Sequence, residues 1–164
     1  MNSLKKPRVL VVCTGNACRS QMAEAIWRHE TAGKQEVFSA GTHPWAVHPL
    51  ARQAVEELGI DMSGQFSKSV HSLVQVAFDL VITLCDHAVG ACPSFPQARR
   101  HLYWPFDDPI LAKGTVQQRL DAFRWTRDQI RHKIRQFLAA SPVIPNELTT
   151  GYHTWESREL MDRL

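Results

Sequence analysis

The chain has 164 residues, of which 44% are hydrophobic and 21% are charged, and its formal net charge is +3 at pH 7. This length and composition favour one globular domain with a sizeable buried core. No apolar run approaches the roughly 20 residues of a membrane span, the first residues lack a signal-peptide core, and the basic residues are interleaved with acidic ones, so we expect a cytoplasmic protein that binds neither a membrane nor nucleic acid.

The first predicted elements are a strand and a helix, joined by a short loop that contains two cysteines. Residues 8–12 form a nearly continuous apolar run, which is typical of a strand buried on both faces of a parallel sheet. Residues 20–31 have the apolar spacing of a helix, which ends near Gly33. Between them lies the sequence Cys-Thr-Gly-Asn-Ala-Cys-Arg-Ser at residues 13–20.

This loop has the features of an oxyanion-binding site with a nucleophile at its mouth. Backbone N–H groups at the start of a helix are unpaired and carry about half a positive charge, so they bind tetrahedral anions. Arg19 can fold back to bind two anion oxygens, and Ser20 can cap the helix or hydrogen-bond a thiolate. We therefore expect Cys13 to be held there as a thiolate. The alternative, a buried structural cysteine, is weakened by the adjacent strand and by the conformational tolerance of Gly15 and Asn16.

The rest of the chain continues the alternation of strands and helices. We expect strands over residues 36–40, 79–84 and 101–104 and helices over residues 49–58, 67–77 and 116–139. Such alternation predicts the α/β class, with a four-stranded parallel sheet and helices on both faces, in one domain over residues 1–140. Residues 141–164 contain several helix breakers and are predicted to be a C-terminal extension, either disordered or docked on the domain.

Three chemically reactive segments follow predicted strands. In parallel α/β folds, ligands bind beyond the carboxyl ends of the strands, so we expect Cys13, Cys85 and the pair Asp107-Asp108 to converge at one edge of the sheet. Asp108 precedes Pro109 in a stiffened loop, and a positioned aspartic acid can give a proton to a leaving oxygen. Asp-Asp-Pro is also a common turn, which is the alternative interpretation of this segment.

Cys85 and Cys92 indicate redox chemistry. Four cysteines in a cytosolic chain favour catalysis, redox chemistry or metal binding over structural disulfides, and their spacing does not match a zinc site, although His87 lies near this pair. If residues 85–92 are helical, the two Cα atoms lie about 10 Å apart, whereas a disulfide needs about 4.4–6.8 Å. Gly90 lowers the cost of unwinding, so the segment has the properties of a redox switch. The alternative is one buried and one incidental cysteine.

Five segments of the chain match one known family in order. They are Cys13-Thr14-Gly15-Asn16-Ala17-Cys18-Arg19-Ser20-Gln21-Met22-Ala23-Glu24, Ser39-Ala40-Gly41, Val81-Ile82-Thr83-Leu84-Cys85, Cys92-Pro93 and Phe106-Asp107-Asp108-Pro109. With these segments the chain resembles the bacterial arsenate reductases of the thioredoxin-coupled kind, which have the low-molecular-weight tyrosine phosphatase fold. The resemblance covers residues 8–138 and leaves the C-terminal extension outside.

The resemblance implies a three-cysteine relay. Cys13 would attack arsenate held by the loop amides and Arg19, while Asp108 protonates the departing oxygen. Cys85 would then attack the arsenic adduct, releasing arsenite and leaving a Cys13–Cys85 disulfide. Cys92 would attack Cys85, and thioredoxin would reduce the resulting exposed disulfide. The substrate-binding residues implied are Thr14, Gly15, Asn16, Ala17, Cys18, Arg19 and Ser20.

The resemblance also bears on cofactors and partners. Some relatives bind a potassium ion at positions that match Asn16, Glu24 and Ser39, with an acidic residue where this chain has Lys68. The lysine ammonium can replace that cation, so we predict no metal and no other cofactor, with Asn16 and Glu24 still bracing the loop. The expected partners are arsenate and a reductant, which is thioredoxin, a glutaredoxin or a low-molecular-weight thiol. We expect a monomer.

Two other functions use the same residues. A tyrosine phosphatase would employ Cys13, Arg19 and Asp108, but such enzymes place aromatic residues after Asp-Pro, where this chain has Ile-Leu-Ala at residues 110–112. The later cysteine pair would then have no role, so we expect at most weak phosphatase activity. A non-enzymatic redox sensor is the third possibility, and it predicts reversible oxidation without turnover. Cys18 is within reach of Cys13 and either forms a protective disulfide or is inert.

Overall fold

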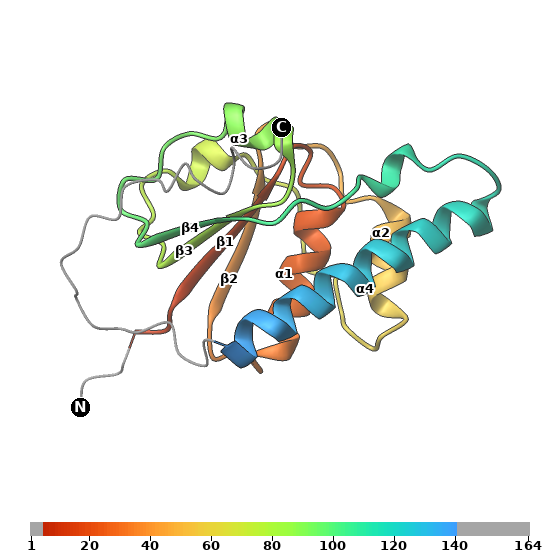
Figure 1. Ribbon diagram of the computed structural model, residues 1–164, viewed down its shortest axis with the longest axis horizontal. Helices are drawn as coiled ribbons and strands as arrows, with labels where there is room; N and C mark the ends of the chain where they lie inside the picture. Colours follow the sequence, from red (N-terminus) through yellow and green to blue (C-terminus); the bar gives the residue numbers. More distant parts are fainter. Residues whose placement is uncertain (1–4, 141–164) are drawn as a thin grey trace.

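The computed structural model describes residues 5–140, in which strands and helices alternate along the chain (Figure 1). The strands are β1 (Arg8–Cys13), β2 (Glu36–Gly41), β3 (Leu80–Thr83) and β4 (Arg100–Tyr103). The α-helices are α1 (Arg19–Glu30), α2 (Pro49–Glu56), α3 (Asp86–Ala91) and α4 (Val116–Ala140), and short 3-10 helices are η1 (Val70–Leu73) and η2 (Pro109–Leu111). The predicted extension over residues 141–164 lies outside the described residues.

The four strands form one parallel sheet in the order β2-β1-β3-β4. β1 is central and its residues from Val9 to Cys13 are buried, as expected for a strand covered on both faces. The chain moves to one side of β1 to form β2 and to the other side to form β3. The carboxyl ends of β1 and β3 therefore flank a topological switch point, where parallel α/β folds bind ligands. The predicted α/β class and four-stranded parallel sheet are confirmed.

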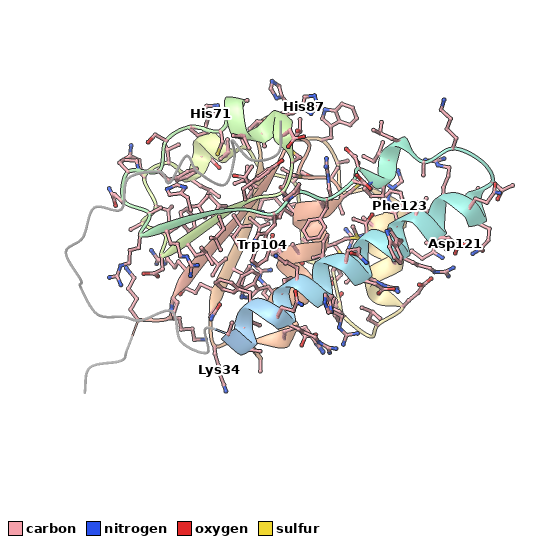
Figure 2. The ribbon with its side chains drawn as sticks, in the orientation of Figure 1. Lys34, His71, His87, Trp104, Asp121 and Phe123 are labelled. Atoms are coloured by element: carbon pink, nitrogen blue, oxygen red, sulfur yellow. The ribbon has the colours of Figure 1, made fainter. Side chains whose placement is uncertain are left out.

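Three helices form one layer on the sheet. α1 contacts β1 and β2 and also packs against α2 and α4, and Figure 1 shows these helices on one side of the sheet with η1 and α3 on the other. Trp27 of α1 stacks on Trp104, with 5.8 Å between ring centroids. Trp104 also contacts Phe137 of α4, and the fully buried Phe123 of α4 stacks on His48 before α2, whereas Asp121 is exposed on that helix (Figure 2). No helix within residues 5–140 combines the length and apolarity needed to cross a bilayer.

The prediction of a helix over residues 67–77 is wrong. Only η1 is helical there, and the residues before it are extended because they pair with the end of β2: Gly41 donates its N–H to the carbonyl of Lys68 (2.9 Å) and forms a bridge with Ser69. The Ser69 side chain then accepts the N–H of His71 and starts a single 3-10 turn. A tertiary contact thus overrides the local helical pattern. The other predicted elements are present, with ends that differ by a few residues.

Candidate active site

The loop over residues 13–20 is held in place by the segment over residues 42–48, which follows β2. Four backbone N–H groups of that segment donate to loop carbonyls: Thr42 to Cys13 (3.3 Å), His43 to Thr14 (2.9 Å), Trp45 to Gly15 (2.8 Å) and His48 to Ala17 (2.9 Å). The C=O and N–H of a trans peptide point in opposite directions, so each outward carbonyl turns the next N–H toward the concave side of the loop. The loop is therefore a nest of amides at the start of α1, suited to an oxyanion.

This bracing segment is a functional part of the site that the sequence did not reveal. The sequence predicts no strand or helix for residues 42–48, which join the strand expected over residues 36–40 to the helix expected over residues 49–58. Backbone-to-backbone contacts leave no periodic or motif signal in a sequence, because any residue with an N–H can make them. The one related signal is Gly41. A Cβ there would lie 2.6 Å from the Thr14 carbonyl oxygen and 2.8 Å from the Asn16 nitrogen, so only glycine permits this close approach of β2 to the loop.

Asn16 fixes the shape of the loop from within. Its backbone is in the left-handed region (φ 44°), and its side chain is completely buried. The side-chain Nδ2 donates to Ser20 Oγ (2.8 Å) and Ser39 Oγ (2.9 Å), while Oδ1 accepts from the backbone N–H of Lys68 (2.9 Å) and from Gln21 Nε2 (3.0 Å). Four hydrogen bonds stabilise a conformation that costs a non-glycine residue about 1–3 kcal/mol.

Cys13 lies at the end of β1 with its sulfur inside this nest. It is buried, and its Sγ lies 2.9 Å from the Ser20 hydroxyl oxygen. Burial raises the pKa of the Cys13 thiol, and the Ser20 hydroxyl and backbone N–H and the Arg19 guanidinium act in the opposite direction. The net direction is upward, which differs from the predicted stabilisation of the thiolate. The groups predicted to stabilise the thiolate are in place, but the loss of water around the sulfur outweighs them.

Arg19 and Asp108 form an ion pair beside Cys13. The Arg19 guanidinium donates to Asp108 Oδ2 (2.7 Å) and to the Phe106 carbonyl oxygen (2.9 Å), and Arg19 is buried at the start of α1. Asp108 Oδ1 also accepts the N–H of Ile110 (3.1 Å) and so caps η2. The two interpretations of the Asp-Asp-Pro segment are therefore compatible, because the same carboxylate makes the turn and faces the loop.

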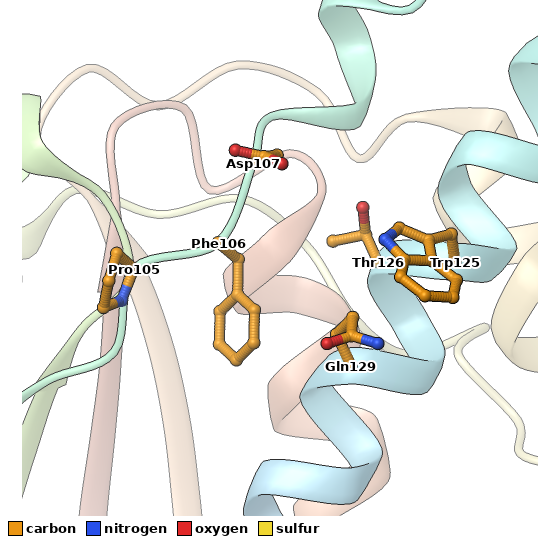
Figure 3. Close-up of a pocket in the computed structure, with 6 residues that line it drawn as sticks. All are labelled: Pro105, Phe106, Asp107, Trp125, Thr126 and Gln129. Atoms are coloured by element: carbon orange, nitrogen blue, oxygen red, sulfur yellow. The ribbon is translucent and has the colours of Figure 1, made fainter.

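Asp107 lines a pocket that is separate from the anion-binding loop. A pocket of about 160 Å3 lies between the chain at residues 105–107 and helix α4 (Figure 3). Its lining residues are Pro105, Phe106, Asp107, Trp125, Thr126 and Gln129. It contains none of the predicted catalytic side chains. Of the two adjacent carboxylates, Asp108 is thus the one that belongs to the anion site.

Cys85 reaches the same loop from β3. It is buried at the N-terminus of α3, and its Sγ lies 3.2 Å from Thr14 Oγ1. Of the residues predicted to converge at one edge of the sheet, Cys13, Cys85 and Asp108 meet at the loop, whereas Asp107 lines the separate pocket. Cys18, at the start of α1, is also buried, and its burial together with the nearby Asp108 and Cys13 raises its pKa strongly, so this thiol stays protonated.

Cys92 is separated from this cluster by α3. It follows the last turn of the helix, donating its N–H to the Ala88 carbonyl (2.8 Å), and burial raises the pKa of its thiol to about 11. The helix thus spans the interval between Cys85 and Cys92, which places their Cα atoms about 10 Å apart. Both cysteines are reduced. His87 is exposed on α3 (Figure 2), and no group of three or more potential metal-ligating residues occurs within residues 5–140.

The Glu24 carboxylate, behind the loop, already has cationic partners. Arg28 contacts Oε1 at 2.6 Å, Lys68 Nζ lies 3.7 Å from Oε2, and Ser39 donates its hydroxyl hydrogen to Oε2. Lys68 thus places its ammonium beside Glu24, where the resemblance predicts that it replaces the potassium ion of some relatives. Burial lowers the pKa of Lys68, and the neighbouring Glu24 opposes that shift.

Comparison with known proteins agrees with this geometry. Residues 8–147 match the family described as low molecular weight phosphotyrosine protein phosphatase. The chain belongs to this family. Its phosphatase-like sheet and anion-binding loop therefore have a common origin with those of its relatives.

Within the low molecular weight phosphatase family, the similar proteins include arsenate reductases. The chain is 40% identical over 134 residues to the arsenate reductase of Halalkalibacterium halodurans, covering 82% of this chain and 96% of that protein. A solved arsenate reductase in the phosphate binding state is 35% identical, with a TM-score of 0.70 and coverage of 82% and 98%. The thioredoxin-dependent arsenate reductase of Corynebacterium glutamicum is 30% identical, with a TM-score of 0.59 and coverage of 84% and 65%.

Proposed function

We propose that this protein is a cytoplasmic arsenate reductase in which Cys13, Cys85 and Cys92 react in turn and thioredoxin restores the reduced state. The observation that carries the proposal is the contact between Cys85 Sγ and Thr14 Oγ1, which brings a second thiol to the loop that holds the first. A hydrolytic enzyme has no use for this second thiol. The similar arsenate reductases described above support the same choice of substrate.

The first step forms a bond between Cys13 sulfur and arsenic. The loop amides bind the arsenate oxygens, and Arg19 exchanges its bonds to Phe106 and Asp108 for bidentate contact with the oxyanion. Asp108, freed from the ion pair, takes up the proton that the Cys13 thiol gives up and passes it to the departing oxygen, which leaves as water. The Cys13–arsenic adduct remains in the nest.

The second step reduces arsenic. Cys85 sulfur attacks Cys13 sulfur, the sulfur–arsenic bond breaks, and its electron pair stays on arsenic, which leaves as arsenite. A Cys13–Cys85 disulfide forms with the loss of two electrons from the two thiols. Thr14, the neighbour of Cys13 in the chain, contacts Cys85 Sγ at 3.2 Å and so keeps the second thiol at the loop that holds the adduct.

The third step transfers the disulfide to the surface. Cys92 sulfur attacks Cys85 sulfur and Cys13 leaves as a thiolate, ready for the next arsenate. Cys92 must first approach, because a disulfide requires a Cα separation of about 4.4–6.8 Å. Five of the six residues of α3 are exposed, and unwinding it therefore gives up little buried surface. The unwound Cys85–Cys92 disulfide is then open to a thioredoxin dithiol.

A coupled assay tests this proposal. Arsenate-dependent NADPH oxidation is measured with thioredoxin and thioredoxin reductase for the parent and for Cys13→Ser, Cys85→Ser and Cys92→Ser. We expect each substitution to abolish multiple turnover. Cys18→Ser is the matched control, because Cys18 is an equally buried loop thiol without a role in the relay, and it should retain turnover.

Two outcomes would contradict the proposal. Full rates in the Cys85 or Cys92 variant would exclude the relay. Efficient hydrolysis of an aryl phosphate without arsenate-dependent NADPH oxidation would identify a phosphatase instead. Replacing thioredoxin by glutaredoxin or by glutathione alone in the same assay identifies the reductant.

A further inference from the structure

Behind the catalytic loop, a chain of side-chain hydrogen bonds runs from the surface to Cys13. Its links are Gln65 Nε2 to Gln21 Oε1 (2.7 Å), Gln21 Nε2 to Asn16 Oδ1 (3.0 Å), Asn16 Nδ2 to Ser20 Oγ (2.8 Å) and Ser20 Oγ to Cys13 Sγ (2.9 Å). Gln21 is completely buried in α1, and Gln65 is half-buried in the loop before η1. An amide is costly to bury unless it is hydrogen-bonded, so the position of Gln21 requires these partners.

Three backbone groups fix the direction of every link. Gln65 Nε2 also donates to the Gln21 carbonyl (3.0 Å), and Gln21 Nε2 also donates to the Phe66 carbonyl (3.0 Å). Asn16 Oδ1 also accepts the backbone N–H of Lys68 (2.9 Å). A backbone carbonyl can only accept and a backbone N–H can only donate, so none of the three amides can be turned end for end. The donors therefore all point along the chain toward Cys13.

The last link follows from this direction. Because Asn16 Nδ2 donates to Ser20 Oγ, an oxygen lone pair is occupied and the single hydroxyl hydrogen of Ser20 is left to reach another acceptor. When Cys13 is a thiolate, its Sγ at 2.9 Å can only accept, so the Ser20 hydroxyl hydrogen then points at it.

We propose that Gln21 and Gln65 are positioning residues, which lock the Asn16 amide so that the Ser20 hydroxyl hydrogen points at the sulfur of Cys13. The importance of this for turnover rests on the proposed function, in which the Cys13 thiolate attacks arsenate. With Gln21 replaced by an apolar side chain, Asn16 Oδ1 keeps only the Lys68 N–H, so the amide can tilt away from its bond to Ser20 although it cannot turn end for end. The Ser20 hydroxyl hydrogen is then no longer held toward the sulfur, and the Cys13 thiolate loses stabilisation.

The test is the pKa of Cys13, obtained from the pH dependence of its alkylation by iodoacetamide and followed on the Cys13 peptide by mass spectrometry. Gln21→Met keeps the length of the side chain and removes its donor. We expect this variant to raise the Cys13 pKa by about one unit, which lowers alkylation at pH 7 about tenfold. Gln65→Met should shift the pKa in the same direction by less, because Gln21 keeps its bond to Phe66. If Gln21→Met does not fold, the Cys13 pKa of Gln65→Met decides whether the inference holds.

Two controls separate positioning from general loss of structure. Gln35→Met removes a comparable half-buried amide, one that accepts from Trp27 Nε1 (2.8 Å) away from the loop, and it should leave the Cys13 pKa unchanged. Asn16→Gly keeps the left-handed backbone but removes the amide, and in this background Gln21→Met should cause no further shift.

An unchanged pKa in both glutamine variants, an equal shift in Gln35→Met, or a full shift in the Asn16→Gly background would overturn the inference. Alkylation uses neither arsenate nor thioredoxin. Failure of arsenate reduction in the parent would therefore contradict the proposed function and leave this measurement intact.

Discussion

The loop over residues 13–20 and the region of helix α3 carry successive thiols of the proposed relay. The loop is fixed by many hydrogen bonds, whereas α3 is short and largely exposed. The loop has four carbonyls bonded to the segment over residues 42–48 and a buried Asn16 with four hydrogen bonds. α3 has six residues, and only Ala88 among them is buried. In the proposed relay, the loop presents fixed donors to a developing charge, whereas α3 changes shape to bring Cys92 to Cys85. The proposed active site thus combines a rigid loop with a short helix that can unwind.

The most damaging change to the rigid part is predicted to be Gly41→Ala. The new Cβ would meet backbone atoms of Thr14 and Asn16 at 2.6 and 2.8 Å, so the loop or the end of β2 must move. We expect arsenate reduction to fall about 100-fold, as for lost oxyanion donors, and the free energy of unfolding to fall by about 1–3 kcal/mol. Steady-state kinetics and urea unfolding measure the two effects. A variant with parent kinetics would show that the loop is not rigid.

The second prediction concerns the pH dependence of Cys92. Burial raises the pKa of this thiol to about 11 from an ordinary value of 9.0, so folded α3 favours the protonated form. Its contribution to stability is present below 9.0 and is lost as the pH rises toward 11. Alkylation of Cys92, measured by peptide mass spectrometry, should increase about tenfold per unit between pH 8 and 10. A midpoint near 9.0 would mean that α3 is already open in the reduced protein.

A smaller effect is expected from Gly90→Ala in α3. A Cβ at this position meets no atom within 4 Å, so the substitution stabilises the helix by about 1 kcal/mol without a clash. Formation of the Cys85–Cys92 disulfide should slow about fivefold, while the first release of arsenite is unchanged. Rapid quenching and thiol counting distinguish the two steps. Gly64→Ala is the matched control, since that Cβ also enters open space, outside the site. Equal slowing of both steps would contradict the division between the two regions.

The smallest predicted effect is that of Lys68→Met. This change removes one of the two cations beside Glu24 and leaves Arg28 in place, so we expect kcat to fall only about threefold. Parent activity should be the same in potassium chloride and in sodium chloride of equal ionic strength. Specific stimulation of the parent by potassium would show that Lys68 does not replace the cation.

The two regions also differ in how far the sequence predicts them. The sequence could predict that Cys13, Cys85 and Asp108 lie close together, because parallel strands end at the same edge of a sheet. A helix over residues 85–92 entered only as a condition for the redox switch, and the structure shows a helix at Asp86–Ala91. These inferences depend on local patterns and on topology.

The rest of the site depends on contacts that leave no pattern. The backbone bonds from residues 42–48 can be made by almost any sequence, and the helix expected over residues 67–77 is replaced by an extended pairing with Gly41. Gln21 reads as an ordinary helix residue until its amide is seen between Asn16 and Gln65. The upward shift in the Cys13 pKa also follows from burial, which only the packed structure defines.

The central claim is that oxidation moves from the rigid loop to α3 one thiol at a time, and a single-turnover experiment on Cys92→Ser tests it most directly. The reduced variant is mixed with excess arsenate without a reductant, and arsenite and disulfides are quantified after quenching. The relay predicts one arsenite per chain and a Cys13–Cys85 disulfide in the same amount. Continued arsenite production, or arsenite released without that disulfide, would contradict it.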